Sequence, residues 1–545
     1  MRRSRRLILF LFVLVLGFVE AGESQSPNGS EGATVGSDVI VGDISTVRYW
    51  GASGGDVAFS LGTISCNIGD EQVRWIYNST FHPVLAQNLY RIKDGRIEQL
   101  GQSWVRHAFV ALAQNFCGSC QSSGTGNLLG IGCSDTSSPG SNGSHTLLGP
   151  KSEVNASTGV FSWPHSSLPQ SGTLDGRLRV KNSNLDPSQN PGARFFVEAH
   201  LVHPDDSDDG NDLNNASYRE VVANSVGGGN WGLNTIGGVP TVREQPAIFA
   251  WQAVHPDVDL YYVDIPNDGR LIVGVRTIQV GKDFHTEVAI QNLSSHRSVR
   301  SLEVDFGSGS ITNVGFHDVH YQFELYSSAD WSSVIGNGQI EWSTEEFATN
   351  QDANALRWGT TYSFWCDSEQ CPAKLTMGMF RPGGVSEVSI DICQSTVIPE
   401  TLTITRGAHS TGGVGELAES DDVDLIIRRA QSDIQARTEF EVKSVSPFAS
   451  PSALEVTLEG AVFSRSPITQ SIELYDYRAN AWEMVDARIA RRFSDSIVTV
   501  SASGDVSRFV ETGTRCMEAR IRYQSDVARS NFSSNTDQFI WTIRE

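Results

Sequence analysis

Residues 101–133 gather most of the side chains in the first half of the chain that are suited to chemistry. Arg106 and His107 are adjacent, and three cysteines follow them within this segment. A histidine beside an arginine suits a general base next to a clamp for a substrate carboxylate. Arg106, His107 and the nearby Asp135 are therefore the candidate catalytic residues. The simpler interpretation is a histidine at the edge of an element, hydrogen-bonded to a neighbouring loop, because one histidine defines no geometry.

The eight cysteines fall into two groups of four, which favours disulfide bridges that stay within each half of an exported chain. The first group is Cys66, Cys117, Cys120 and Cys133, and the second is Cys366, Cys371, Cys393 and Cys516. In the second group we expect a short Cys366–Cys371 staple and a longer Cys393–Cys516 clamp. The Cys117-x-x-Cys120 spacing also occurs in redox and zinc sites, but no second such pair and no thioredoxin-like strand and helix accompany it. Structural bridges are therefore favoured.

The most acidic stretch of the chain follows His203 and offers oxygen ligands for a calcium ion. Calcium takes about six to eight oxygens from carboxylates, carbonyls and water. The candidate ligands are Asp205, Asp206, Asp208, Asp209 and Asp212. The spacing is not that of an EF-hand, because Ala216 stands where that loop needs a bidentate glutamate. The other interpretation is a solvated acidic turn, since crowded like charges repel one another.

Two His-x-x-His pairs, His200/His203 and His317/His320, raise the alternative of a transition-metal site. Both pairs lie in strand-like segments, where residues three apart point to opposite faces of a sheet, so they cannot share one ion unless a bulge intervenes. Neither pair shows the HExxH pattern of zinc proteases. The sequence matches Gly-x-Ser-x-Gly at residues 51–55, but this match lies between two predicted strands rather than before a helix, and no P-loop glycine pattern occurs. Paired carboxylates for glycoside cleavage stay open, because their separation is spatial rather than sequential.

Strands must position these groups, because runs of alternating apolar and polar residues recur along most of the chain. The clearest local feature is a hairpin in which Asp94-Gly95 joins two such runs. Residues 104–116 carry apolar side chains at helical spacing, which predicts a short helix packed on the sheet. Glycine and serine dominate residues 122–155, and so long a loop is typical of a functional or pinned segment.

The sequence thus predicts a mostly β protein of tandem β-sandwich domains, with one short helix in a disulfide-linked N-terminal domain. The predicted division is a signal peptide at 1–22, a disordered tether at 23–37, an N-terminal β-rich domain with a cysteine-containing loop at 38–240, a β-sandwich domain at 241–398 and a C-terminal β-sandwich domain at 399–545. A cationic start followed by a short apolar run is typical of a secretory signal, with an uncleaved anchor as the alternative. We expect no membrane span after cleavage, and a secreted or cell-surface location, with the periplasm as a variant.

The charge of the chain limits its partners. At 545 residues the net charge is −22, and the predicted signal is itself cationic, so the mature protein is more acidic still. Such a surface repels phosphate backbones and anionic membranes. Nucleic acid is therefore not an expected partner.

Four phrases are specific enough to suggest common descent. They are Gly101-Gln-Ser-Trp with His107, Gly132-Cys-Ser-Asp135, Gly315-Phe-His-Asp318 and Asn354-Ala-Leu-Arg-Trp-Gly359. On these phrases, residues 38–385 resemble a family of large exported bacterial proteins of undefined function. The C-terminal part resembles sandwich domains appended to other such exported proteins. The resemblance implies a fold unit and a location outside the cytoplasm, and it supplies no reaction and no catalytic residue.

The expected function is binding or structural work at a surface or in the medium, with a polysaccharide or a neighbouring surface protein as partner. Tryptophans in polar contexts fit this interpretation, since aromatic rings stack on sugar faces. The alternative is a hydrolase or lyase acting on an extracellular polymer, with its site near His107. Convergence of His82, Arg106, His107 and Asp135 in one concave pocket would favour the enzyme, and scatter would favour the binding protein.

Overall fold

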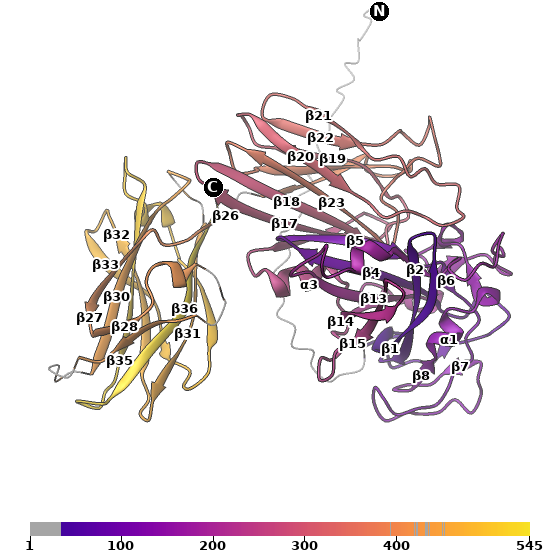
Figure 1. Ribbon diagram of the computed structural model, residues 1–545, viewed down its shortest axis with the longest axis horizontal. Coiled ribbons are helices and arrows are strands. Elements are labelled where there is room, and N and C mark those ends of the chain that lie inside the picture. The colour runs from indigo at the N-terminus through magenta and orange to yellow at the C-terminus, as the bar shows by residue number, and fades with distance from the viewer. Residues whose placement is uncertain are drawn as a thin grey trace, which may run out of the picture. The chain divides into compact units, whose positions relative to one another are not determined.

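The computed structural model describes residues 34–392, 394–418, 420, 423–430, 434, 436–449, 451 and 453–544, with the side chains of 394 and 395 left out. The predicted signal peptide and most of the predicted tether lie outside these residues. The fold is mostly β, as the alternation predicts, and is built as tandem antiparallel sandwiches (Figure 1). Its described α-helices are short: α1 (Pro139–Asn142), α2 (Pro204–Asp208) and α3 (Ile248–Val254).

The first sandwich packs a small sheet on a larger one. The small sheet contains β1 (Val39–Ser53), β2 (Asp56–Asn67), β8 (Ser134–Ser137) and β12 (Leu178–Lys181). The larger sheet has the order β15 (Asn230–Thr235), β14 (Ala216–Gly227), β13 (Arg194–Val202), β4 (Val84–Lys93), β6 (Val105–Arg106) and β9 (Leu148–Gly149), with β5 (Arg96–Gln102) also paired to β4. Two short ribbons complete it: β3 (Val73–Arg74) with β7 (Leu128–Leu129), and β10 (Val154–Asn155) with β11 (Val160–Phe161). Apolar side chains from both sheets fill the space between them.

The hairpin at Asp94-Gly95 is confirmed. It joins β4 and β5, and both turn residues have positive φ, which is the backbone that an Asp-Gly turn supplies.

The helix expected at residues 104–116 is wrong. This segment contains only the short strand β6, and its remaining backbone groups bond to distant loops instead of to the preceding turn. The His107 N–H donates to Leu147 O at 2.8 Å, and the Ala111 N–H donates to Gly126 O at 2.9 Å. Ala108 has a φ of +64°, which a helix does not allow. Residues 104–109 are instead buried without a break, whereas Val110 and Leu112 are exposed, which is not the pattern of an amphipathic helix.

The second sandwich follows α3. One sheet has the order β16 (Asp259–Asp264), β17 (Arg270–Val280), β18 (Asp283–Asn292), β23 (Thr360–Ser368) and β20 (Ile311–His317). The other has the order β21 (Ser332–Ile335), β22 (Gln339–Ser343), β19 (Val299–Asp305), β24 (Lys374–Met379) and β25 (Glu387–Asp391). Between the sheets lies a core that includes Trp331, Trp342 and Phe364.

The first and second sandwiches share a buried contact in which β5 lies against β18 and β23 (Figure 1). The Thr361 N–H donates to Gln99 Oε1 at 2.7 Å, and the Ser363 hydroxyl donates to Ile97 O at 2.6 Å. One apolar cluster draws on both sandwiches and on α3. These contacts hold the end of β5 in place, and that end borders the site described below.

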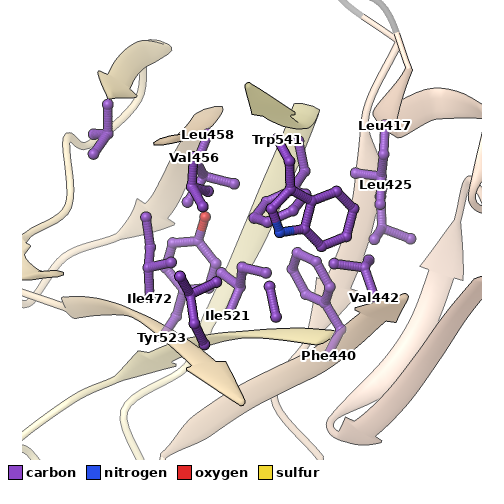
Figure 2. Packing of buried hydrophobic residues seen from close by; sticks show 14 of the residues in the cluster. Leu417, Leu425, Phe440, Val442, Val456, Leu458, Ile472, Ile521, Tyr523 and Trp541 are labelled. Carbon is purple, nitrogen blue, oxygen red and sulfur yellow. The ribbon is translucent and has the colours of Figure 1, made fainter. Parts of the chain in front are cut away.

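The last sandwich has a core of its own. One sheet has the order β28 (Ala408–Thr411), β29 (Leu425–Arg428), β36 (Phe532–Arg544), β31 (Ala453–Ser464) and β34 (Ser496–Ser501), with β26 (Gln394–Val397) paired to β36. The other has the order β27 (Thr401–Arg406), β30 (Arg437–Val445), β35 (Cys516–Gln524), β32 (Thr469–Asp476) and β33 (Ala481–Ile489). Figure 2 shows Trp541 and Phe440 packed between the sheets, among residues of this sandwich alone. The predicted boundaries after residues 240 and 398 stay predictions.

Five 3-10 turns occur in the described chain. They are η1 (His145–Leu147), η2 (Lys151–Glu153), η3 (Asn182–Leu185), η4 (Gly415–Leu417) and η5 (Val506–Phe509). None of the helices that the structure describes is long and apolar enough to cross a membrane.

The first four cysteines form two bridges among themselves, Cys66–Cys117 and Cys120–Cys133. They pin the loop after β6 to β2 and back on itself. The Cys366–Cys371 staple is wrong, because Cys366 is a buried free thiol inside β23, where its side chain faces the sandwich core. Cys393 lies outside the described residues, and its expected partner Cys516 is a free thiol in the described chain.

Candidate functional site

His107 lies at the centre of a buried cluster of rings. Its Nδ1 is 3.3 Å from Nε2 of His82, and its ring stacks on that of His165 with the centroids 4.6 Å apart. Phe161 and Trp163 pack against both His82 and His107. Convergence of His82 and His107 was the condition set for the enzyme alternative, whereas nothing in the sequence indicated the aromatic partners, which follow the Gly/Ser-rich loop.

A glycine makes the close approach of the rings feasible. A Cβ on Gly149 of β9 would stand 2.7 Å from Nε2 of His107 and 2.8 Å from Cβ of His165. Both distances are far inside van der Waals contact, so any larger residue would force the rings apart.

Burial keeps these imidazoles neutral. Desolvation lowers the pKa of His107 to about 2 and that of His82 to about 3, and the neighbouring histidines and Arg106 push in the same direction. A base with so low a pKa is a poor proton acceptor near neutral pH.

Arg106 and Asp135 attract one another beside this cluster. Desolvation lowers the pKa of Arg106 to about 10 and raises that of Asp135 to about 6, and the opposite charge of each partner counteracts both shifts. The Arg106 guanidinium lies over the ring of Phe109 at 4.2 Å. All four candidate groups are at most 6% exposed, and none of them lines the cavities of about 530 and 470 Å³ that the described residues form. They converge, but in a packed interior rather than in an open pocket.

The acidic stretch forms α2 and its flanks, and its carboxylates face different protein groups. Asp205 pairs with Arg74, and Asp206 accepts hydrogen bonds from Val39 N at 2.8 Å and Asn215 Nδ2 at 2.6 Å. Asp209 accepts from Ser37 N at 2.6 Å. Asp208 is exposed, and Asp212 is half-buried with a pKa raised to about 6 by desolvation. In the part of the chain that the structure describes, no three His, Cys, Asp or Glu residues form a group suited to a metal ion. Calcium at this loop stays a prediction.

The first His-x-x-His pair is divided between two environments. His200 lies in β13 beside Trp358, whereas His203 caps α2, accepting from Asp205 N at 3.0 Å, and stacks on Trp75.

The second pair borders an open groove, which we call the His317 groove. Its volume is about 530 Å³. The polar side chains that line it are Asp56, Gln99, Arg179, Lys181, Asn184, His317, Asp318, His320, Gln322 and Asp330, and the aromatic ones are Phe316, Tyr321 and Phe323. The lining comes from the first sandwich on one side and from residues 316–330 on the other.

Hydrogen bonds across the groove floor fix the segment after β20 to the first sandwich. Nε2 of His317 is 3.1 Å from Gln99 O, and Gln322 Nε2 donates to Gln102 O at 3.0 Å. The Trp104 indole N–H donates to Gln322 O at 2.6 Å. Trp104 therefore supports the rim of this groove.

The groove presents both hydrogen-bond donors and acceptors, together with an apolar face. Phe323 is 37% exposed, whereas Gln99 is fully buried, with no hydrogen-bond partner for its Nε2 among the described residues. Arg179 is paired with Asp56 at 2.7 Å, so the two charges at this rim balance. Only the His317/His320 spacing and the Gly315-Phe-His-Asp318 phrase marked this place in the sequence, and neither indicated that residues near 100 and 180 would complete it.

No family profile and no curated protein matches the chain. Solved structures with partial similarity include a mutant family 29 carbohydrate-binding module, with 8% identity, 27% of this chain and 92% of that chain covered, and a TM-score of 0.19. They also include a family 61 module in complex with β-1,4-galactotriose, with 6% identity, 28% and 88% covered, and a TM-score of 0.16. A Listeria monocytogenes protein in complex with glucose, magnesium and calcium covers 53% of this chain over 21% of its own length, with 6% identity and a TM-score of 0.18. Similarity at this level carries no argument about this chain.

Proposed function

We propose that the protein acts outside the cytoplasm as a binding protein and that the His317 groove holds a segment of polysaccharide. The observation that carries the proposal is the lining of the groove, where amides, imidazoles and charged groups surround an exposed aromatic ring. Sugar hydroxyls both donate and accept hydrogen bonds, and sugar faces pack on aromatic rings. A groove open to solvent also suits a chain that continues past both ends of the bound segment.

The location is supported by the cysteines of the first sandwich. All four are bridged, and such bridges persist in oxidising compartments. The cationic and apolar start of the chain supports the same location, as does the acidic composition, which disfavours nucleic acid as a competing partner.

Binding to a panel of soluble polysaccharides by affinity electrophoresis tests the proposal. Phe323→Ala is expected to weaken binding of the recognised polymer about fivefold or more, because a stacking contact contributes about 1 kcal/mol. Phe493→Ala is a matched control: Phe493 is also exposed and also has a positive φ, and it lies in the last sandwich. Equal binding by wild type and Phe323→Ala, for every polymer bound, would contradict the assignment to this groove.

A second function rests on the carboxylates of the same groove. Asp56, Asp318 and Asp330 all line it. Desolvation raises the pKa of Asp318, and a raised pKa favours the protonated carboxyl group that a general acid needs. A polymer hydrolase would use such a group as its general acid. For the enzyme alternative we therefore propose Asp318, rather than His107, as the acid.

Release of new sugar ends from the recognised polymer decides between the two functions. Cleavage that is lost in Asp318→Asn would establish the hydrolase. Binding without cleavage leaves the groove as a recognition site. Asp56→Asn is the control: it also removes a charge from the groove, so cleavage that survives in Asp56→Asn but not in Asp318→Asn indicates a specific acid.

A further inference from the structure

A buried lysine in the first sandwich directs its amine at three neutral acceptors. Lys151 lies at the start of η2 and is 2% exposed. Its Nζ donates to Gln102 Oε1 at 2.9 Å, to Gly359 O at 3.0 Å and to Asn88 Oδ1 at 3.4 Å. None of these three acceptors carries a charge.

The amide of Asn88 stands between this amine and a carboxylate. Its Nδ2 donates to Glu198 Oε1 at 2.8 Å, while its Oδ1 faces Lys151. Asn88 in β4 and Glu198 in β13 are cross-strand partners in the register of the sheet, so the backbone itself fixes this pairing. Both residues are fully buried.

The surroundings exclude water and hold each group in place. The ring of Trp358 lies 5.5 Å from Lys151 Nζ, and its indole N–H donates to Lys151 O at 3.2 Å. Glu198 is held by Ala247 N at 2.6 Å and by Gln291 Nε2 at 2.7 Å. The side chains therefore have little freedom to move apart.

A lysine in such a place is a better nucleophile than one in water. An ammonium group loses its hydration when buried, so desolvation lowers the pKa of Lys151 to about 8, although the charges of Glu324 and Glu198 act in the opposite direction. An appreciable fraction of the amine is then neutral near neutral pH, and the neutral amine is the reactive form.

We propose that Lys151 and Asn88 become joined by an intramolecular amide bond, with Glu198 carrying the proton. The lone pair of the neutral Nζ adds to Cγ of Asn88, and the Cγ–Nδ2 bond then breaks. One proton passes from Nζ to Nδ2 through the Glu198 carboxylate that faces Nδ2, and ammonia leaves. The products are a secondary amide and one molecule of ammonia, so the reaction needs no oxidant and no cofactor.

The position of the Glu198 carboxylate favours reaction at the Asn88 amide over reaction at the Gln102 amide. Gln102 is nearer to Nζ, but its Nε2 donates to His320 O at 3.2 Å, and a peptide carbonyl does not relay a proton. The Asn88 amide alone combines contact with the amine at one end and contact with a carboxylate at the other. The bond would tie β4 to η2 and close a covalent loop around the cysteine-rich segment.

Peptide mass analysis of the reduced and alkylated full-length protein tests this directly. Trypsin does not cleave after an acylated lysine, so the bond yields peptide 75–91 joined to peptide 107–177, lighter by one ammonia than the sum of the two. Separate recovery of peptide 75–91 and of a peptide ending at Lys151 would overturn the proposal. A link from Lys151 to peptide 97–106 would overturn the choice of Asn88, because Gln102 lies in that peptide.

Variants test the role of each group. Glu198→Gln keeps the shape but removes the proton carrier, and it is expected to leave the two peptides separate; a link formed at the wild-type extent would overturn the role of Glu198. Gln102→Met is the matched control and is expected to retain the link. Lys151→Arg is expected to abolish it. The wild-type digest requires no variant, so misfolding of Glu198→Gln would leave that test intact.

Discussion

At the scale of single residues, the first sandwich buries an unusual number of groups that titrate. His82, His107 and His200 are at most 2% exposed, and desolvation lowers the pKa of each of them to about 3 or below. Their structural role is to fill space as neutral aromatic rings with polar edges. This burial lowers the free energy of unfolding at low pH, because the histidines bind protons in the unfolded chain and stay unprotonated in the folded one.

We expect the protein to lose stability as the pH falls below 6.5. The folded-state pKa values of His82 and His107 are depressed to about 3 and about 2 from 6.5, so the unfolded state binds more protons throughout that window. Each group then removes about 1.4 kcal/mol of unfolding free energy per pH unit. Urea unfolding at a series of pH values measures the slope.

His107→Gln is expected to reduce this slope by about one proton, since glutamine does not titrate. His320→Gln is the control, because the His320 side chain is 63% exposed. An unchanged slope in His107→Gln would show that the histidine cluster is not the source of the acid sensitivity.

The acidic loop contains both a buried, hydrogen-bonded carboxylate and an exposed one, and their effects on stability are expected to differ. Asp206→Ala leaves the N–H of Val39 and the amide of Asn215 without an acceptor in the interior, and we expect a loss of about 3 kcal/mol. Asp208→Ala at the exposed neighbour is expected to stay within about 0.5 kcal/mol of wild type. Thermal unfolding measures both. Repeating the wild-type melt with added calcium tests the predicted ion, since binding raises the Tm with calcium concentration.

At the scale of elements, alternation of apolar and polar residues was sufficient to predict the mostly β fold and the Asp94-Gly95 hairpin, but not the short strands between residues 105 and 161. The segment after Trp104 was misread because a few apolar residues at helical spacing do not by themselves make a helix, and the deciding factor is the partner of each backbone N–H. Those partners, such as Leu147 for His107, lie far along the chain. The His317 groove was missed for the same reason: Gln99, Arg179 and His317 meet only through sheet topology.

The two disulfide bridges of the first sandwich are expected to contribute unequally to its stability against unfolding. Cys66–Cys117 spans 51 residues and Cys120–Cys133 spans 13. In the chain-entropy description a longer closed loop stabilises more, here by about 1 kcal/mol. Denaturant unfolding of Cys66→Ser/Cys117→Ser should therefore show the larger loss when compared with Cys120→Ser/Cys133→Ser. The reverse order would indicate that packing of the exposed loop, rather than loop closure, dominates.

At the scale of the whole molecule, the cores indicate which parts fold together. One apolar cluster contains Tyr90 and Phe196 of the first sandwich, Trp251 of α3 and Ile272 of the second sandwich. The Trp251 indole N–H donates to Gly95 O at 2.9 Å, and Arg96 forms two 2.7 Å hydrogen bonds to Glu287. The core of the last sandwich draws only on residues from 397 to 543. Cooperative unfolding follows shared burial, because separating two elements exposes the cluster that both of them cover.

We therefore expect two calorimetric transitions: one for the first and second sandwiches together and one for the last. Glu287→Ala leaves the Arg96 guanidinium at a buried contact without its carboxylate, so it should lower the first transition and leave the second in place. Trp541→Ala should do the opposite, with a loss of about 4 kcal/mol from the cavity it opens in the last core. A shift of both transitions by either substitution would contradict independent cores. A split of the first transition in the wild type would show that the shared cluster is too weak to couple the two sandwiches.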